Sequence, residues 1–171
     1  MKENDYFLNL LNNPTFNPFD FKEVGFNVND VMIWEKLNPC PAVKQPRYSN
    51  CFEYMFIFSK GAPKTFNPIM VPCKCAGQLY DSTAKNIDGE SGRHKLTYNV
   101  NKEKIKSNIW EIAVAQNKTE HPAVFPYQLA YDHIKSWSNE GEIVYDPFMG
   151  SGTTALAAVD LKRNWIGSEI S

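Results

Sequence analysis

A glycine-rich turn between a short apolar run and a helix-like run is the clearest chemical signal in this chain. It lies between Glu142 and Thr154, with Gly150 and Gly152 in the turn itself. Glycine tolerates backbone dihedrals and close approaches that a side chain forbids. The amides that open the following helix present partial positive charge to a polar ligand. The turn therefore predicts a site for a nucleotide-like cofactor.

An acidic residue follows the glycines at a useful distance. Glu169 ends the next strand-like run, which starts at Asn164. It lies slightly nearer than the roughly 20 residues at which an α/β cofactor fold places a carboxylate on ribose hydroxyls. The combination favours an adenosyl ligand.

Two other glycine-rich motifs have to be weighed against this one. A phosphate-binding P-loop needs a Gly-Lys-Ser/Thr sequence, and no lysine occurs between Tyr145 and Leu161. The segment from Gly150 to Ala155 does match the dinucleotide fingerprint, which is a weak signal by itself. A nicotinamide-binding fold would need further strands after Glu169, and the sequence supplies none there. We therefore expect the strand before the glycine turn to pair with strands from upstream in the chain.

The segment from Asp146 to Thr154 resembles the S-adenosylmethionine motif of the amino-group DNA methyltransferases, which methylate adenine N6 or cytosine N4. Upstream, the segment from His121 to Pro126 resembles the part of this family that completes the cofactor pocket. The runs Ile33 to Pro39, Arg47 to Met55 and Phe58 to Gly61 resemble its paired strands. The order of these segments is that of the permuted β-type subgroup, and the resemblance covers about Gly25 to Lys60 and Ser107 to Ser171.

The resemblance implies an α/β fold built on a Rossmann-like methyltransferase sheet, with S-adenosylmethionine as cofactor and double-stranded DNA as partner. The residues that it places around the cofactor are Asp146, Phe148, Gly150, Ser151, Gly152, Thr153, Glu169, His121, Phe125 and Pro126. Those in the glycine turn would surround the methionine end. Glu169 would bind the ribose, and the segment from His121 to Pro126 would close the pocket.

The family's catalytic signature is absent. That signature is Asp, Asn or Ser followed by Pro-Pro and an aromatic residue, and the chain contains no Pro-Pro pair. It orients the target amine and stacks on the flipped base. Asn13 to Phe16 is the nearest approximation, but the stretch before it, Tyr6 to Leu11, has helical spacing, and a crossover of about 30 residues does not fit before Val28. We assign no catalytic residue.

The absent motif makes the expected sheet incomplete. In the family, the strand that carries it lies between the cofactor strand and the outer hairpin, and a buried parallel strand with unpaired backbone groups is costly. We therefore expect a gene fragment, half of a split enzyme that needs a complementing polypeptide, or a decayed remnant, and an isolated chain that is inactive. The alternative is a catalytically silent DNA-binding or subunit-interaction remnant.

Other elements follow from local patterns. Apolar runs bounded by Asn, Pro and Gly predict strands over Val28 to Lys36 and Phe52 to Ser59, and a further strand within Asn108 to Ala115. A helix should begin at Pro126, with His133 as a solvated or capped helix residue.

Candidate DNA contacts come from two places. The loop between the first two strands carries Lys44, Arg47 and Tyr48, which could clamp phosphate or simply be solvated. The polar stretch 62–106 is a candidate target-recognition insertion within a single partial domain, 1–171. A mobile surface segment is the alternative for this stretch.

Composition sets wider limits. The 171 residues, 43% hydrophobic and 13% aromatic, suit a globular α/β protein. No run approaches the roughly 20 apolar residues of a membrane span, so we expect a cytoplasmic protein with no membrane partner. The net charge of −1 does not by itself indicate a nucleic-acid partner. The four cysteines lack the two-pair spacing of a zinc site, so we expect free thiols and no metal.

Overall fold

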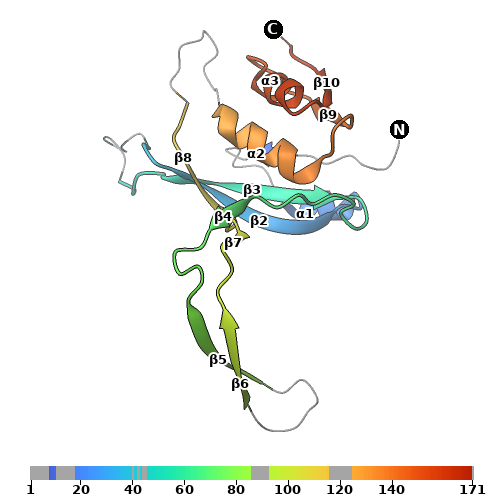
Figure 1. The fold of residues 1–171 in the computed structure, drawn as a ribbon. Helices are drawn as coiled ribbons and strands as arrows, with labels where there is room; N and C mark the ends of the chain where they lie inside the picture. Colours follow the sequence, from blue (N-terminus) through green and yellow to red (C-terminus); the bar gives the residue numbers. More distant parts are fainter. Residues whose placement is uncertain are drawn as a thin grey trace. The chain divides into compact units, whose positions relative to one another are not determined.

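The computed structural model describes residues 8–10, 18–39, 41, 43, 46–85, 93–115 and 125–170. Two compact units make up the chain (Figure 1). The first unit is Met1–Asn67 with Ser107–Ser171, and the second, which we call the insertion unit, is Pro68–Lys106. In chain order the elements are β1 (Leu8–Leu10), α1 (Pro18–Glu23), β2 (Asn27–Lys36), β3 (Phe52–Ser59), β4 (Met70–Pro72), β5 (Leu79–Lys85), β6 (Arg93–Asn99), β7 (Glu103–Ile105), β8 (Ile109–Ile112), α2 (Tyr127–Trp137), β9 (Ile143–Asp146), α3 (Thr153–Asp160) and β10 (Asn164–Gly167).

A four-stranded sheet of order β1-β3-β2-β8 forms one part of the first unit. The strand β3 is antiparallel to both β1 and β2, and β2 is parallel to β8. Residues alternate between the two faces of β3 because successive side chains of a strand point to opposite sides. Glu53, Met55 and Ile57 are buried on one face, whereas Phe52 and Tyr54 are exposed on the other. The strands predicted from apolar runs over β2, β3 and β8 are confirmed.

One local prediction is wrong at the start of the chain. Tyr6 to Leu11 has helical spacing, but Leu8–Leu10 is a strand whose residues pair with Met55 to Ile57 of β3. Spacing over six residues is a weak signal, and ladder hydrogen bonds to a long neighbouring strand outweigh it. The sheet therefore gains an edge strand that the sequence did not indicate.

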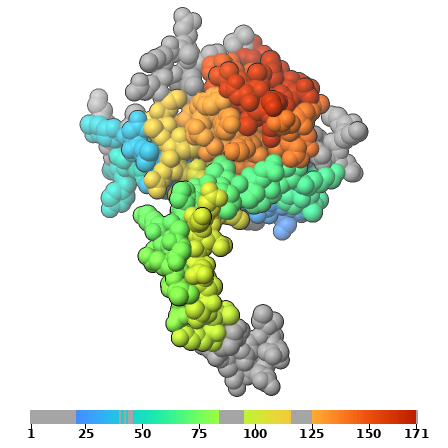
Figure 2. Space-filling model, in the orientation of Figure 1, coloured from blue at the N-terminus to red at the C-terminus, as the bar shows by residue number. Residues whose placement is uncertain are grey.

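The glycine-rich region forms a second, smaller sheet. Strand β9 is parallel to β10, and α3 connects them as a crossover. Helix α2 packs against α3 through a core of small and aliphatic side chains, and Figure 2 shows their orange and red segments in direct contact. Buried members of this core are Ala130, Ile134, Ala157, Ala158 and Leu161.

Helix α2 also contacts the four-stranded sheet, and His133 is at the centre of that contact. We expected a solvated or capped residue, but only 3% of His133 is exposed. Its Nε2 lies 3.1 Å from the Met55 sulfur, and its ring centroid lies 4.6 Å from that of Trp110. The expectation was wrong because α2 is buried on two sides, by the four-stranded sheet and by α3, and His133 lies on the side that meets the sheet. Helix α2 thus joins the four-stranded sheet to α3, the crossover helix of the smaller sheet.

The sheet is incomplete, as expected. Within the described residues, β9 pairs with β10 alone and β1 pairs with β3 alone. Each of these strands therefore has a second edge to which no described strand adds. The two sheets of the first unit are separate ladders rather than one continuous ladder.

The insertion unit consists of two antiparallel ribbons, β4 with β7 and β5 with β6. It begins at Pro68, a few residues after the start of the polar stretch at Ala62. Pairing in the longer ribbon joins Tyr80 with Tyr98 and Asp81 with Thr97. None of the helices in the described part of the chain is long and apolar enough to span a membrane.

Candidate cofactor site

The candidate site is built by the turn between β9 and α3. Gly150 has φ +51° and Gly152 has φ +83°. Residues other than glycine are strained at such positive φ values. Gly152 is also the N-cap of α3, and no side chain caps this helix end. The sequence prediction of a strand, a glycine turn and a helix is confirmed here. The uncapped amides of the first turn of α3 suit an acceptor group on a ligand.

The carboxylate of Asp146 holds the turn in shape from the carboxyl end of β9. One oxygen accepts a hydrogen bond from the Phe148 amide at 2.9 Å, and the other accepts one from the Thr154 hydroxyl at 2.6 Å. A single side chain therefore ties the start of the turn to the first turn of α3. Asp146 shapes the site by fixing its backbone.

Glu169 reaches the same turn from the end of β10. One of its carboxylate oxygens accepts a hydrogen bond from the Gly150 amide at 2.6 Å, although the two residues are 19 positions apart in the sequence. Backbone hydrogen bonds from Met149 N to Ser168 O and from Ser168 N to Asp146 O hold the two segments together. The structure thus brings Glu169 beside the glycines, as the spacing suggested.

Other side chains of the turn remain accessible. Phe148 is 78% exposed, and the hydroxyl oxygens of Ser151 and Thr153 lie 3.3 Å apart. Exposed aromatic and hydroxyl groups next to free helix amides can contact a ligand that carries both apolar and polar parts.

Gly167 lies in close contact with Met149 of the turn, and the sequence did not single out either residue. A Cβ atom on Gly167 would lie 2.0 Å from the Met149 Cε atom, so only glycine leaves room for that side chain. The signal was available, because a glycine directly before the Ser-Glu pair at the end of a strand can mark a close approach. Nothing in the local pattern showed which side chain approaches.

The structure describes only the last two residues of the predicted closing segment. Phe125 packs against the α2–α3 core, and buried Pro126 is the N-cap of α2. His121 lies outside the described residues. The roles of Phe125 and Pro126 beside a cofactor stay a prediction.

A hydrogen bond joins the first residue of α2 to the last residue of α3. The Tyr127 hydroxyl donates to a carboxylate oxygen of Asp160 at 2.6 Å. This bond to an acceptor carboxylate raises the pKa of Tyr127 to about 12, since ionisation of the phenol would remove the donated proton. Tyr127 therefore remains a hydrogen-bond donor throughout the physiological pH range.

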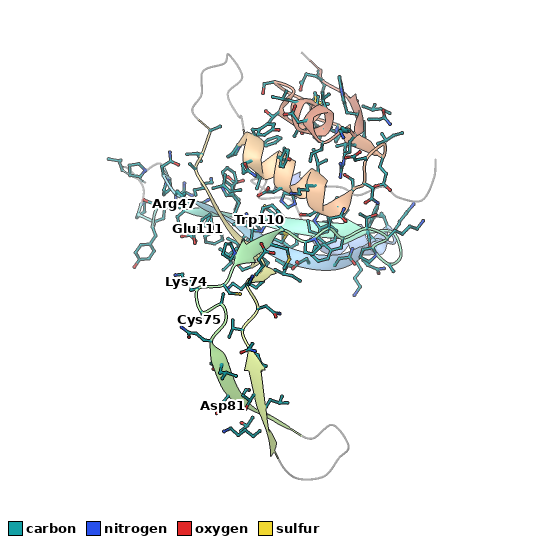
Figure 3. The ribbon with its side chains drawn as sticks, in the orientation of Figure 1. Arg47, Lys74, Cys75, Asp81, Trp110 and Glu111 are labelled. Carbon is teal, nitrogen blue, oxygen red and sulfur yellow. The ribbon has the colours of Figure 1, made fainter. Side chains whose placement is uncertain are left out.

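The predicted DNA contacts of the β2–β3 loop are partly described. Arg47 and Tyr48 are exposed, Tyr48 almost completely at 99%, whereas Lys44 lies outside the described residues. Figure 3 labels Arg47 in this loop, which follows the end of β2. Both side chains are accessible to a partner.

The insertion unit carries its own surface features. An open concavity of about 560 Å³ is lined by residues of this unit alone, among them Met70, Cys73, Tyr80 and Tyr98. Lys95 forms an ion pair with Asp81 at 2.8 Å on the longer ribbon, and this bond, with one from Thr97, lowers the pKa of Asp81. Cys51, Cys73 and Cys75 are free thiols, and the described residues hold no group of three or more side chains placed to bind a metal.

Comparison with known proteins agrees with this geometry. The family model described as "DNA methylase" matches residues 8–171. The chain belongs to the DNA methylase family. Among its relatives are the orphan methyltransferase M.BamHII of Bacillus amyloliquefaciens, 45% identical over 164 residues, and the type II methyltransferase M.MjaI of Methanocaldococcus jannaschii, 31% identical over 169 residues. Each match takes in 88% of this chain but only 60% and 48% of those proteins, respectively.

Two solved structures have a similar fold. The M1.HpyAVI–SAM complex has a TM-score of 0.63 and 28% identity, and the match covers 99% of this chain and 70% of the other. The cytosine-N4-specific PvuII DNA methyltransferase also has a TM-score of 0.63, covers 100% of this chain and 61% of the other, and at 19% identity supports the fold alone. The Rossmann-like methyltransferase fold expected from the sequence is confirmed.

Proposed function

We propose that this chain is the cofactor-binding and DNA-contacting part of an S-adenosylmethionine-dependent DNA methyltransferase that acts on adenine N6 or cytosine N4. The observation that carries the proposal is the meeting of the glycine turn and Glu169, joined by the hydrogen bond from Gly150. The geometry matches what an adenosyl ligand requires, namely positive-φ glycines, free helix amides and a carboxylate within one small region. Membership in the DNA methylase family supports the reaction class.

In this proposal, different residues of the site bind different parts of the cofactor. S-adenosylmethionine would supply an activated methyl group on a positively charged sulfonium. Phe148 offers an exposed ring, which attracts a cation through its π face. Gly150 and Gly152 leave room for the methionine end, and Ser151 and Thr153 offer hydroxyls. Glu169 would exchange its bond with the Gly150 amide for the ribose hydroxyls, and the segment that ends in Phe125 and Pro126 would close the pocket.

The amine-orienting group comes from outside these residues in our proposal. The sequence contains no Pro-Pro pair, and β9 and β1 each have an edge to which no described strand adds. A strand that carries the catalytic motif would pair with these edges and place its side chain beside the cofactor. We propose that a complementing polypeptide, or the rest of a longer protein, supplies that strand.

DNA contacts are assigned to the β2–β3 loop and the insertion unit. Arg47 and Tyr48 are exposed in the loop, and the sequence adds Lys44, which lies outside the described residues. The insertion unit contains seven Lys or Arg residues and four Asp or Glu residues, a formal charge of +3 in a chain whose total is −1. Basic side chains on a β-ribbon suit phosphate contacts, and the ribbon itself is narrow enough for a DNA groove. We propose that this unit reads the target sequence.

The test uses this chain with a complementing polypeptide that carries the catalytic strand, cut from the part of M.BamHII outside its match to this chain. We expect methyl transfer from tritiated S-adenosylmethionine to unmethylated DNA by the mixture and background counts from either part alone. Gly152→Val should abolish transfer, because a branched side chain is strained at φ +83° and blocks the approach of the cofactor. Calorimetry should show S-adenosylmethionine binding in preference to NAD.

Gly61→Val is the matched control, since Gly61 also has positive φ, +74°, with no atom within 4 Å of its added Cβ. It carries the same backbone strain outside the glycine turn and should leave transfer largely intact. Equal loss in both variants would attribute the effect to folding. A mixture that binds DNA but never transfers methyl would favour the alternative of a silent DNA-binding remnant.

A further inference from the structure

We propose that Asp81 and Lys95, on one face of the β5–β6 ribbon, read a single G·C base pair in the major groove of DNA. The Asp81 carboxylate would accept a hydrogen bond from the cytosine N4 amine, and the Lys95 ammonium would donate to guanine O6 and N7. The inference rests on the proposed function and deepens it, because it names the residues by which the insertion unit distinguishes one base pair from the others.

One face of this ribbon is polar, and we define the polar face as Asp81, Thr83, Lys95 and Thr97. Asp81 is directly paired with Thr97, and Thr83 with Lys95, and directly paired residues of adjacent strands point to the same side. The Thr97 hydroxyl and the Lys95 ammonium both reach the Asp81 carboxylate, at 2.7 and 2.8 Å. All four side chains are exposed. The face therefore offers a carboxylate, an ammonium and two hydroxyls, which are groups that read base edges.

The opposite face of the ribbon carries aromatic side chains. Tyr80 is directly paired with Tyr98, and the centroids of their rings lie 5.8 Å apart. Both rings line the concavity of the insertion unit, together with Met70 and Ile105 of the shorter ribbon. The aromatic side thus faces a hollow of its own unit, which leaves the polar face available to a partner.

A carboxylate on a surface that contacts DNA needs a specific partner. Phosphates repel it, so Asp81 would weaken DNA binding unless it accepts a hydrogen bond from a base amine. The hydrogen bonds from Lys95 and Thr97 lower the pKa of Asp81, so this carboxyl is ionised at neutral pH and can only accept hydrogen bonds. In the major groove the usual donor to an acidic side chain is the cytosine N4 amine.

The ion pair itself matches the major-groove edge of a G·C pair. Lys95 Nζ lies 2.8 Å from Asp81 Oδ2, so a donor and an acceptor lie side by side on the ribbon, where Figure 3 labels Asp81. A G·C pair presents the complementary order, because the cytosine N4 donor lies beside the guanine O6 and N7 acceptors. A two-stranded ribbon fits the major groove.

Exposure makes this ion pair easy to exchange for contacts with DNA. The side chain of Lys95 is 70% exposed and that of Asp81 is 56% exposed. An ion pair in such a position contributes little to stability, because water solvates both charges. Replacement of the Asp81–Lys95 bond by bonds to a base pair therefore costs the ribbon little.

The experiment mixes the whole chain with the complementing polypeptide from M.BamHII and sequences the duplexes that it binds from a pool with a randomised segment. The wild type should select a motif with a G·C position at which A·T weakens binding roughly 10-fold. Asp81→Ala and Lys95→Gln should each remove the preference at that position alone, and Lys95→Arg should keep it, since Arg also binds guanine O6 and N7. Glu103→Ala is the matched control, because it removes an exposed carboxylate from the shorter ribbon and should leave the motif unchanged.

Modified bases test the same contact in the wild-type protein, so the result does not depend on the folding of a variant. 7-Deazaguanine at the selected position removes the N7 acceptor and should weaken binding roughly 5-fold. Inosine lacks only the minor-groove N2 amine and should bind as guanine does. The effect of 7-deazaguanine should disappear in Lys95→Gln, a non-additivity expected for groups in direct contact.

Other results overturn the inference. A wild type that selects no sequence or a motif of A·T pairs alone would show that the ion pair reads no G·C pair, as would a motif that Asp81→Ala and Lys95→Gln leave unchanged. Weaker binding to inosine than to 7-deazaguanine would place the contact in the minor groove. Methyl transfer by Asp81→Ala at the unchanged motif would overturn this inference while the proposed function stands. The expected change of motif in a mixture that never transfers methyl would support the inference and refute the proposed function.

Discussion

Asp146 shows how a single side chain can determine the shape of a binding turn. Both of its oxygens accept hydrogen bonds from within the turn and the first turn of α3, from the Phe148 amide and the Thr154 hydroxyl. The negative charge lies near the amides of the helix N-terminus, where it is favourable. The turn is therefore pre-organised by the chain itself, and a ligand does not have to order it.

The contact between Gly167 and Met149 gives a prediction at the residue scale. Gly167→Ala should lower the free energy of unfolding by about 1–3 kcal/mol, the usual cost of overpacking. The added Cβ would lie 2.0 Å from Met149 Cε and 3.2 Å from its Cβ, so the side chain must move and disturb the turn. Urea titration measures the stability, and calorimetry should show weaker S-adenosylmethionine binding.

A double variant controls this experiment. Met149→Ala removes the clashing Cε and Cγ atoms, so Gly167→Ala should cost less in that background, a non-additivity expected for neighbouring residues that touch. Strict additivity of the two changes would show that the clash does not cause the destabilisation. Gly167 would then have another role in the turn.

Residue types and spacing located the centre of the site but not its packing. The sequence identified the glycines and Asp146 because they lie in one short motif, and it identified Glu169 by its spacing from the glycines. Gly167 and Met149 are 18 positions apart, and their contact depends on the pairing of β9 with β10. His133 was misjudged for the same reason, since its neighbours Met55 and Trp110 come from strands remote in sequence.

Helix α2 is the element that unites the first unit. One side meets β3 and β8 through His133, and another meets α3 through Ala130 and Ile134. The position of α3, and hence of the glycine turn at its start, depends on this helix. Small alanines between α2 and α3 allow the two backbones to lie close together.

Weaker packing of α2 on α3 should therefore affect both stability and binding. Ile134→Ala removes a side chain that is only 8% exposed and should lower the free energy of unfolding by about 2–5 kcal/mol. Lys135→Ala changes the next residue of the same helix, which is exposed, and should cost little. Chemical denaturation measures both. Equal effects would contradict the assignment of the loss to the packing of α2 on α3, because alanine is the better helix former at both positions.

Among the elements, the sequence predicted the strands whose apolar runs were long enough. The eight to ten residues of β2 and β3 carried a clear apolar pattern, and the turn residues marked their ends. The three residues of β1 carried none, because such a short strand is stabilised by its neighbour rather than by its own composition.

The whole molecule divides its charge between two units. The insertion unit has a formal charge of +3 in a chain of −1, so the first unit is acidic by −4. The near-neutral net charge of the whole chain therefore hides a basic unit. This explains why the net charge gave no indication of a DNA partner. The separation suits a protein in which one part holds a cofactor and another binds phosphates.

Removal of the insertion unit tests this division. The amide of Lys106 donates a hydrogen bond to the Ile69 carbonyl at 2.8 Å, and β4 is antiparallel to β7, so the two ends of the unit are adjacent. Replacement of Pro68–Lys106 by a short glycine linker should leave S-adenosylmethionine binding by the complemented protein unchanged. Its affinity for DNA should fall, and the slope of log K against log salt should decrease by roughly 0.9 for each DNA phosphate that the protein no longer neutralises.

A charge variant of the intact unit separates electrostatics from shape. Changing Lys102, Lys104 and Lys106 to Gln removes three charges while the β4–β7 pairing can persist, because Lys102 and Lys104 are exposed and Lys106 is half-buried, and Gln keeps a polar side chain at each position. This variant should lower affinity equally for target and non-target DNA, since phosphate contacts carry no sequence information. The deletion should also abolish the preference for the target sequence. A deletion variant that keeps both its preference and its salt slope would place DNA recognition in the first unit, with the β2–β3 loop of Arg47 and Tyr48 as the remaining candidate.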